Sequence, residues 1–276
     1  MSWCRERGYA SLPAAPVAVA AYLAERAETV RPATVRLAAA AIGDRHRQNS
    51  LPNPIDTDGV KIVLSGLARQ GQAGAQKQAK GISREDLAAI RATACRPRAG
   101  RGGRTESKAQ ARARGRTDIA LCVVMFDGML RRSEAAALTW ADISRAADGS
   151  GRLTVRRSKT DPEGAGKVLW ISPGTVAALN AVRGEDDGDT DSVFGLSGQQ
   201  ISRRIAAACE AAGLGKGYTG HSLRVGAAQA LAGANISLAA IMENGRWQSS
   251  RMPARYTRHA AAAQSAMAKL YGHNGQ

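Results

Sequence analysis

Four short segments of the chain carry side chains that together could exchange a phosphodiester bond without a metal ion. The groups are two guanidiniums, an ammonium, an imidazole, an indole N–H and a phenol, and they belong to Arg131, Arg224, Lys159, His221, Trp247 and Tyr256. Guanidinium, imidazole and indole nitrogens donate hydrogen bonds to phosphate oxygens, and a tyrosine hydroxyl can serve as a nucleophile. Each piece alone is unspecific, but the ordered set supplies every group that such a reaction requires.

His221 and Arg224 are three residues apart in a segment with helical periodicity, so their side chains project from the same face. Both can donate to a phosphate, and the first turn of a helix favours an anion. The alternative is a surface histidine beside a surface arginine, which is the commoner case for this spacing alone.

Arg131 follows an apolar helical segment, residues 117–130, that must belong to a core. A charged group held at that point needs a partner. Glu134 can be that partner, and so can a bound phosphate; a purely structural Arg–Glu pair explains the two residues equally well.

Lys159 lies where two short alternating segments, 151–157 and 166–171, are joined by turn residues, so we place it on a β-hairpin. An ammonium near two arginines can have a lowered pKa and act as a general acid; the alternative is a solvated lysine.

Trp247 supplies one N–H donor or only packs. Tyr256 is in a cationic segment that we expect to be exposed, where positive charge would favour the phenolate. Tyr218 is its main rival.

The bulk composition points to a nucleic-acid partner. The chain has 276 residues and a net charge of +16. Such an excess of basic over acidic side chains favours a polyanionic partner. A high-GC coding bias would explain the preference for arginine over lysine but not the net positive charge. The four cysteines have no metal-ligand spacing, so we expect no metal and no cofactor. We see neither a membrane-spanning stretch nor a signal peptide and expect a cytoplasmic protein.

Two domains follow from the periodicity. Residues 1–80 contain helical patterns at 16–27, 34–47 and 57–69, and residues 70–82 are a polar linker. A second domain, 83–276, begins at a helix capped by Ser83. It is predicted to be mainly α with a small antiparallel sheet. Residues 91–116 contain nine basic side chains and one acid and are predicted to form a basic loop, either solvated or in contact with DNA.

These residues resemble the tyrosine recombinases, or phage-type integrases, and are most similar to the Cre-like branch. The resemblance rests on Gly220-His221-Ser222-Leu223-Arg224, on the segment 241–247 ending in Trp247, and on Arg255-Tyr256. It extends from about Pro13 to the C-terminus. The branch carries a tryptophan where most relatives have a second histidine.

The resemblance implies a tyrosine recombinase fold, with a helical core-binding domain that clamps DNA and a catalytic domain. It implies that Tyr256 attacks the scissile phosphate and stays joined to the DNA 3′ phosphate. Arg131, His221, Arg224 and Trp247 would then hold that phosphate, Lys159 would protonate the 5′ oxygen, and Glu134 would support the site from behind. The partner would be double-stranded DNA bound by a homotetramer, with no membrane and no small-molecule substrate.

Two features depart from the family's pattern. Residues 1–8 look like the end of a first helix, so one helix of the clamp would be missing or would start elsewhere, and the basic segment 91–116 is longer than the branch requires. The stretch from Ala260 to Leu270 is rich in small residues and would dock on a neighbouring protomer or on its own chain.

The predicted function is site-specific DNA recombination. One alternative is a type IB-like topoisomerase, which shares the chemistry but relaxes DNA without exchanging partners. Another is a non-catalytic DNA-binding remnant; the complete set of six groups argues against it, because random loss would remove at least one.

Overall fold

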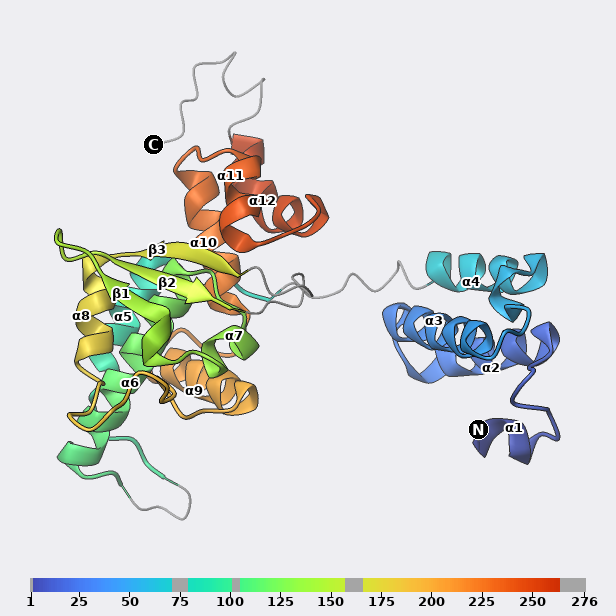
Figure 1. Ribbon diagram of the computed structural model, residues 1–276, viewed down its shortest axis with the longest axis horizontal. Helices are drawn as coiled ribbons and strands as arrows, with labels where there is room; N and C mark the ends of the chain where they lie inside the picture. Colours follow the sequence, from blue (N-terminus) through green and yellow to red (C-terminus); the bar gives the residue numbers. More distant parts are fainter. Residues whose placement is uncertain (1, 71–78, 101–104, 157–165, 264–276) are drawn as a thin grey trace. The chain divides into compact units, whose positions relative to one another are not determined.

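The computed structural model describes residues 2–70, 79–100, 105–156 and 166–263 (Figure 1). The chain divides into two compact units, Met1–Lys77 and Gln78–Gln276. Lys159, the stretch 71–78 and the residues after 263 lie outside the described part. None of the described helices is long and apolar enough to cross a membrane.

The first unit is a small helical module. Its elements are α1 (Ser2–Glu6), α2 (Pro16–Thr29), α3 (Pro32–Gln48), the 3-10 turn η1 (Pro54–Asp56) and α4 (Asp58–Gln70). Proline opens both α2 and α3, a position where its missing N–H costs no hydrogen bond. Apolar residues three to four positions apart on these helices form the core of the unit, which contains Val19, Leu23, Val35, Ala39 and Val60.

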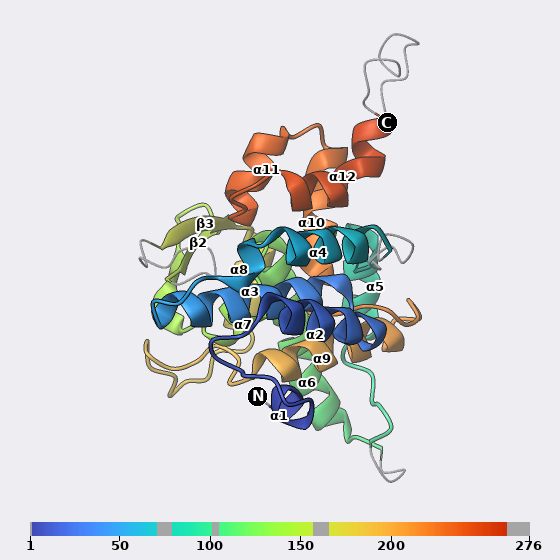
Figure 2. The same cartoon turned by 90° about the vertical axis from the view of Figure 1, so that its right-hand side faces the viewer.

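The second unit surrounds one large core with helices and a three-stranded sheet. Its helices are α5 (Arg84–Thr93), α6 (Lys108–Asp127), α7 (Arg132–Ala136), η3 (Trp140–Asp142), α8 (Pro173–Asn180), α9 (Gly198–Ala211), α10 (Ser222–Gly233), α11 (Leu238–Gly245) and α12 (Arg251–Ala263). The C-terminal half of α6 is buried on nearly all sides, as its continuous apolar run predicts. In both views α10, α11 and α12 stay together at one end of the unit (Figures 1 and 2).

The sheet is antiparallel in the order β1-β2-β3, with β1 at Ile143–Arg145, β2 at Gly151–Val155 and β3 at Lys167–Ile171. Leu153 on the central strand is paired with Ile143 on one side and Leu169 on the other. The alternation of β3 buries Leu169 and Ile171 and leaves Trp170 exposed. The fold is thus mainly α with one small antiparallel sheet, which confirms the predicted fold class.

The structure corrects the predicted basic loop and defines the elements that follow it. Helix α6 begins at Lys108, so the second half of the basic segment 91–116 is helical. Helix α7 ends at Ala136, and Thr139 then caps a separate 3-10 turn with Asp142. Residues 253–256 belong to the longer helix α12.

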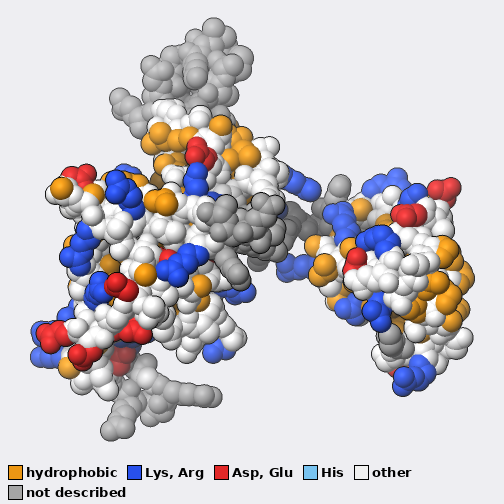
Figure 3. Space-filling view, viewed as in Figure 1, with side chains coloured by type: hydrophobic (Ala, Val, Ile, Leu, Met, Phe, Trp, Pro, Cys, Tyr) orange, Lys and Arg blue, Asp and Glu red, His pale blue; other side chains and the backbone are white. Residues whose placement is uncertain are grey.

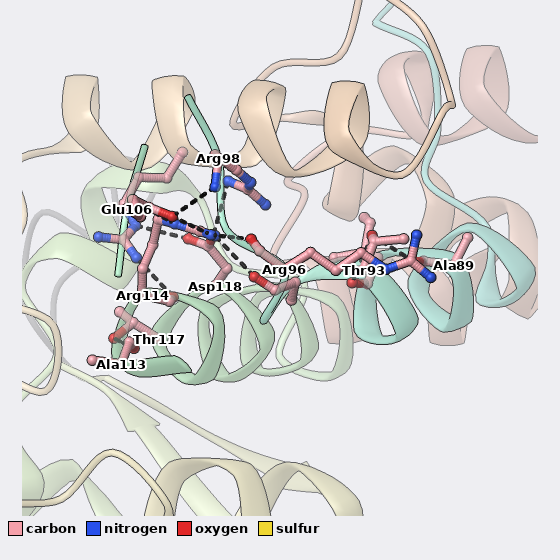
Figure 4. A network of polar contacts seen from close by, with 12 residues as sticks. Ala89, Thr93, Arg96, Arg98, Glu106, Ala113, Arg114, Thr117 and Asp118 are labelled. Atoms are coloured by element: carbon pink, nitrogen blue, oxygen red, sulfur yellow. Dashed lines mark hydrogen bonds and ion pairs between the residues drawn. The ribbon is translucent and has the colours of Figure 1, made fainter. Parts of the chain in front are cut away.

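A buried carboxylate explains why the basic segment 91–116 is not simply a solvated loop. Asp118 is 1% exposed and accepts from Arg98, Arg114 and Arg204 at 3.3, 3.2 and 2.8 Å (Figure 4). Arg114 also donates to Glu106 at 2.7 and 2.8 Å. These charge-assisted bonds fix both ends of the segment's remaining loop to α6, and Arg204 ties α6 to α9.

Candidate functional site

The candidate site lies in the second unit, where the start of α7, the start of α10 and the turn from α11 into α12 meet. The structure brings five of the six predicted groups together there: Arg131, His221, Arg224, Trp247 and Tyr256. The sixth, Lys159, lies between β2 and β3 but outside the described residues. Glu134 is also at the site, one turn into α7.

The predicted nucleophile faces the imidazole of His221. His221 is the residue that precedes α10, and its Nε2 lies 2.9 Å from the hydroxyl oxygen of Tyr256 on α12. The two rings meet edge to face with centroids 5.8 Å apart. Helix α12 packs on α10, and Gln229 of α10 donates to the Tyr256 carbonyl at 3.3 Å. Tyr256 is therefore held at two points: His221 contacts its hydroxyl, and Gln229 contacts its backbone carbonyl.

Arg224 is the most deeply buried charged side chain of the site. It is 0% exposed, and it donates to the carbonyl of Met129 at 2.5 Å and to the carbonyl of Gly245. The Trp247 ring covers it, with the guanidinium carbon 4.1 Å from the ring centroid, a contact that contributes about 0.5–2 kcal/mol. Its Nε has no hydrogen-bond partner within the described residues, so one donor of this guanidinium remains available for an added acceptor.

Arg131 and Glu134 form a tight local unit at the start of α7. The Glu134 carboxylate accepts from the Arg131 backbone N–H at 2.8 Å and from its guanidinium at 2.6 Å. Glu134 is 6% exposed. The structural Arg–Glu pair suggested by the sequence therefore exists, and it lies beside Arg224 and Arg246 rather than apart from the other basic side chains.

Trp247 is positioned by the absence of a side chain at Gly245. A Cβ built on Gly245 would lie 1.9 Å from Cζ3 of the indole, so the ring rests directly on the backbone at the end of α11. The other edge of the ring approaches Tyr256, with centroids 6.0 Å apart. Trp247 therefore connects the buried arginine to the tyrosine.

The charges of the cluster shift the pKa values of the proton-handling groups. Burial, followed by the positive charges of Arg224 and Arg131, lowers the pKa of His221 to about 4, so its imidazole is neutral at pH 7. Burial and the neighbouring guanidiniums likewise lower the pKa of Arg224 to about 9, which leaves it charged. Burial works against ionisation of Glu134, but Arg246 and Arg131 outweigh it and hold the pKa of that carboxyl below its usual value.

Two expectations for Tyr256 were wrong. The tyrosine is not exposed, since only 6% of its surface reaches solvent. Its pKa is raised rather than lowered, because burial outweighs the opposite effect of Arg224 and Arg255. The sequence showed the nearby positive charges but could not show how deeply α12 seats the phenol. The rival Tyr218 is also buried and lies under the ammonium of Lys80.

Sequence reasoning missed Arg246. Its backbone is in the left-handed conformation at the end of α11, with φ 53°, and its guanidinium turns back to Glu134 at 2.7 Å. The only sequence signal was the run Asn244-Gly245-Arg246-Trp247, in which Gly245 is the residue expected to take a left-handed helix end. A third guanidinium thus joins Arg131 and Arg224 at the site, and it shares the Glu134 carboxylate with Arg131.

Comparison with known proteins agrees with this architecture. The family model for the phage integrase family matches residues 106–263, which is more than half of the chain, and the chain belongs to that family of tyrosine recombinases. It is 25% identical to the Cre recombinase of Escherichia phage P1, over 98% of this chain and 83% of the relative. It is also 25% identical to an integrase/recombinase XerD homologue of Selenomonas ruminantium, over 92% of this chain and 76% of the relative.

Solved structures of recombinases share the fold. The XerH recombinase bound to a palindromic difH substrate superposes with a TM-score of 0.65 and 17% identity, covering 94% of this chain and 72% of XerH. The Tn1549 transposon integrase in complex with transposon right end DNA has a TM-score of 0.60 and 13% identity, covering 93% and 85%. The chain is a site-specific recombinase that cleaves and rejoins DNA strands.

Proposed function

We propose that Tyr256 of this recombinase attacks the scissile phosphate and forms a 3′-phosphotyrosine link. The observation that carries the proposal is the 2.9 Å contact between its hydroxyl and His221 Nε2, beside a cluster of guanidiniums. A nucleophile within hydrogen-bond reach of a base is the arrangement that activates a weak hydroxyl. The bond energy of the broken ester is kept in the new link, so the exchange needs no nucleotide cofactor.

His221 takes the phenolic proton in this scheme. Because its pKa is about 4, the imidazole is neutral near pH 7; with its proton on Nδ1, Nε2 accepts from the tyrosine hydroxyl. Burial keeps Tyr256 protonated until attack. Since the tyrosine is 6% exposed, attack also requires α12 to move when DNA is bound, so that the oxygen reaches phosphorus in line.

Arg131 and Arg224 hold the phosphate and stabilise the charge that builds up on its oxygens, an effect typically worth several kcal/mol per donor. The free Nε of Arg224 and the 19% exposed side chain of Arg131 are the donors that support this assignment. Trp247 shields the buried guanidinium. Glu134 acts on Arg131 rather than on the phosphate.

Lys159 protonates the departing 5′ oxygen. The strands that flank it support this role, because β3 begins at Lys167, whose ammonium pairs with Glu243 of α11 at 2.9 Å. That pair ties the base of the hairpin to the helix that precedes Trp247.

We further propose that both units bind duplex DNA, the first as the helical clamp that the family uses. Lys and Arg side chains are spread over the surface of each unit in Figure 3, while five acidic side chains of the second unit lie on the loop between α8 and α9. Contacts from these Lys and Arg side chains to DNA phosphates would make the affinity for DNA fall steeply as the salt concentration rises.

The working form that we propose is a homotetramer on DNA. A cavity of about 550 Å³ in the second unit is lined in part by Phe126, Trp170 and Leu231 and in part by charged Arg84, Glu85 and Asp127, and Trp170 is 62% exposed. An exposed aromatic side chain of this size suits contact with a second protomer. Sedimentation of the Tyr256→Phe variant on target duplex tests this: four protomers joining two duplexes are expected, and one protomer per duplex would contradict it.

A nicked duplex tests the chemistry. Duplexes that the protein retains from a random pool supply the target site, and a nick beside the scissile phosphate lets the released fragment diffuse away and traps the covalent complex. Wild type should give a protein–DNA adduct that survives denaturation. Tyr256→Phe, which keeps the ring but removes the nucleophilic oxygen, should give none. No adduct from wild type, or an adduct from Tyr256→Phe, would refute the assignment.

The topoisomerase alternative predicts a different substrate range. Supercoiled plasmid that lacks the target site should remain supercoiled with this protein, because a recombinase acts at its site. Broad relaxation of such a plasmid would favour the topoisomerase.

A further inference from the structure

We propose that Arg246 is a positioning residue, which fixes Arg131 and Arg224 around the scissile phosphate by joining Glu134 to the turn that carries Trp247. The inference deepens the proposed function and rests on it. It concerns a residue that the sequence pattern left without a role.

The contacts of Arg246 connect two distant parts of the second unit. One nitrogen, Nη1, donates to the carbonyls of Gly128 and Asn244 at 3.0 Å each. The other, Nη2, donates to the Met129 carbonyl at 3.1 Å and to Glu134 at 2.7 Å. Gly128 and Met129 belong to the turn between α6 and α7 and Glu134 to α7 itself, whereas Asn244 lies in the last turn of α11. A single guanidinium therefore joins the segment of Arg131 to the segment of Trp247.

Both phosphate-binding arginines share acceptors with Arg246. The Met129 carbonyl receives one bond from Arg224 and one from Arg246. Oε1 of Glu134 accepts from the Arg131 guanidinium, and Oε2 accepts from the Arg131 backbone N–H and from Arg246. In addition, the Arg246 carbonyl accepts weakly from Arg131 at 3.4 Å. Displacing Arg246 would thus disturb the partners of Arg131 and of Arg224 together.

Its own geometry argues against direct phosphate binding. The side chain is 8% exposed, and protein oxygens already receive the four hydrogens of Nη1 and Nη2. Its charge acts through neighbours instead. Among the influences that lower the pKa of Glu134, Arg246 is the largest, so it helps to keep that carboxylate ionised and bonded to Arg131.

The left-handed backbone at Arg246 offers a clean perturbation. Its φ of 53° is strained for a side chain but easy for glycine. Arg246→Gly therefore favours the same turn while it removes the guanidinium. Arg246→Lys keeps the positive charge but, as a compact ammonium with three donors, cannot reproduce the planar four-bond bridge. Arg145, an exposed arginine on β1, supplies the charge-matched control Arg145→Ala.

The trapped-adduct assay is run under single-turnover conditions, with DNA affinity measured separately by anisotropy. Arg246→Gly should slow cleavage about 100-fold, since a shift of about 1 Å in positioning groups can cost that much, with affinity within about threefold of wild type. Arg246→Lys should cleave at a rate between those of wild type and Arg246→Gly, and Arg145→Ala should cleave at the wild-type rate. Normal cleavage by Arg246→Gly, or a loss of affinity that accounts for its slower cleavage, would overturn the proposal.

A neutral substrate separates positioning from general structural damage. When a methyl group replaces one non-bridging oxygen of the scissile phosphate, that phosphate loses its negative charge and depends less on guanidiniums. The factor by which Arg246→Gly cleaves more slowly than wild type should then shrink at least tenfold. Equal deficits on both substrates would mean that Arg246 supports only the fold and would overturn the proposal.

The pair with Glu134 provides a second check. If Arg246 acts through Glu134, the double variant Arg246→Gly/Glu134→Gln should cleave about as slowly as the slower single variant, because linked residues are not additive. Additive losses would overturn the proposal. Failure of wild type itself to form the adduct would refute the proposed function as well, whereas normal wild-type cleavage with an unaffected Arg246→Gly would refute this inference alone.

Discussion

Gly245→Ala should impair cleavage through the indole of Trp247. The added Cβ would lie 1.9 Å from Cζ3 and 2.1 Å from Cε3 of the ring, and ordinary van der Waals contact begins at 3.4 Å, so the ring must retreat by about 1.5 Å. The ring is a rigid plane held between Gly245 and Arg224, so it cannot bend away as a flexible side chain would. Its retreat must disturb the contact with Arg224, whose guanidinium carbon lies 4.1 Å from the ring centroid.

The magnitude follows from that displacement. Overpacking of this kind costs about 1–3 kcal/mol of stability, and misplacement of about 1 Å at a reacting site can cost about 100-fold in rate. We therefore expect Gly245→Ala to remain folded but to form the trapped adduct about 100-fold more slowly than wild type. Circular dichroism and urea denaturation measure the first effect, and the nicked duplex measures the second.

Gly233→Ala is the matched control. Gly233 is the last residue of α10, and a Cβ there meets nothing within 4 Å. Alanine should leave cleavage unchanged and stabilise the helix slightly, by up to about 1 kcal/mol. Cleavage by Gly245→Ala within threefold of the Gly233→Ala rate would refute the reasoning, because the ring would then have no positioning effect.

Two further predictions concern buried charge. Asp118→Asn should lower the free energy of unfolding by about 3–5 kcal/mol, because it leaves three guanidiniums around a neutral amide. In the same urea denaturation, the control Asp189→Asn, at an exposed position, should lower that free energy by less than about 1 kcal/mol. Equal losses in the two variants would contradict a stabilising role for the buried carboxylate. The pKa of His221 is about 4 when folded against 6.5 as its reference, so the unfolded chain binds more protons between those values and stability rises with pH across that window. Between pH 7 and pH 5 the free energy of unfolding of wild type should fall by about 2 kcal/mol more than that of His221→Gln. Equal losses in the two proteins would contradict the lowered pKa of His221.

Periodicity and capping chemistry located most elements because these signals are local. Ser83 predicted the start of α5, and the structure shows its reciprocal capping box with Asp86. The weakest predictions were ends and joins. Helix α6 extends through the basic segment to Lys108 because Asp118 and Glu106 neutralise arginines that, from the sequence, looked solvated.

The sequence by itself determined the types and order of the chemical groups: two arginines, a histidine, a tryptophan and a tyrosine at spacings that identify the family. It could not determine how they meet. The contact of His221 with Tyr256, the deep burial that raises the tyrosine's pKa, and the guanidinium of Arg246 on Glu134 all join residues far apart in the chain. Only tertiary packing decides such contacts, because burial and charge act through distance in space and not through separation in sequence.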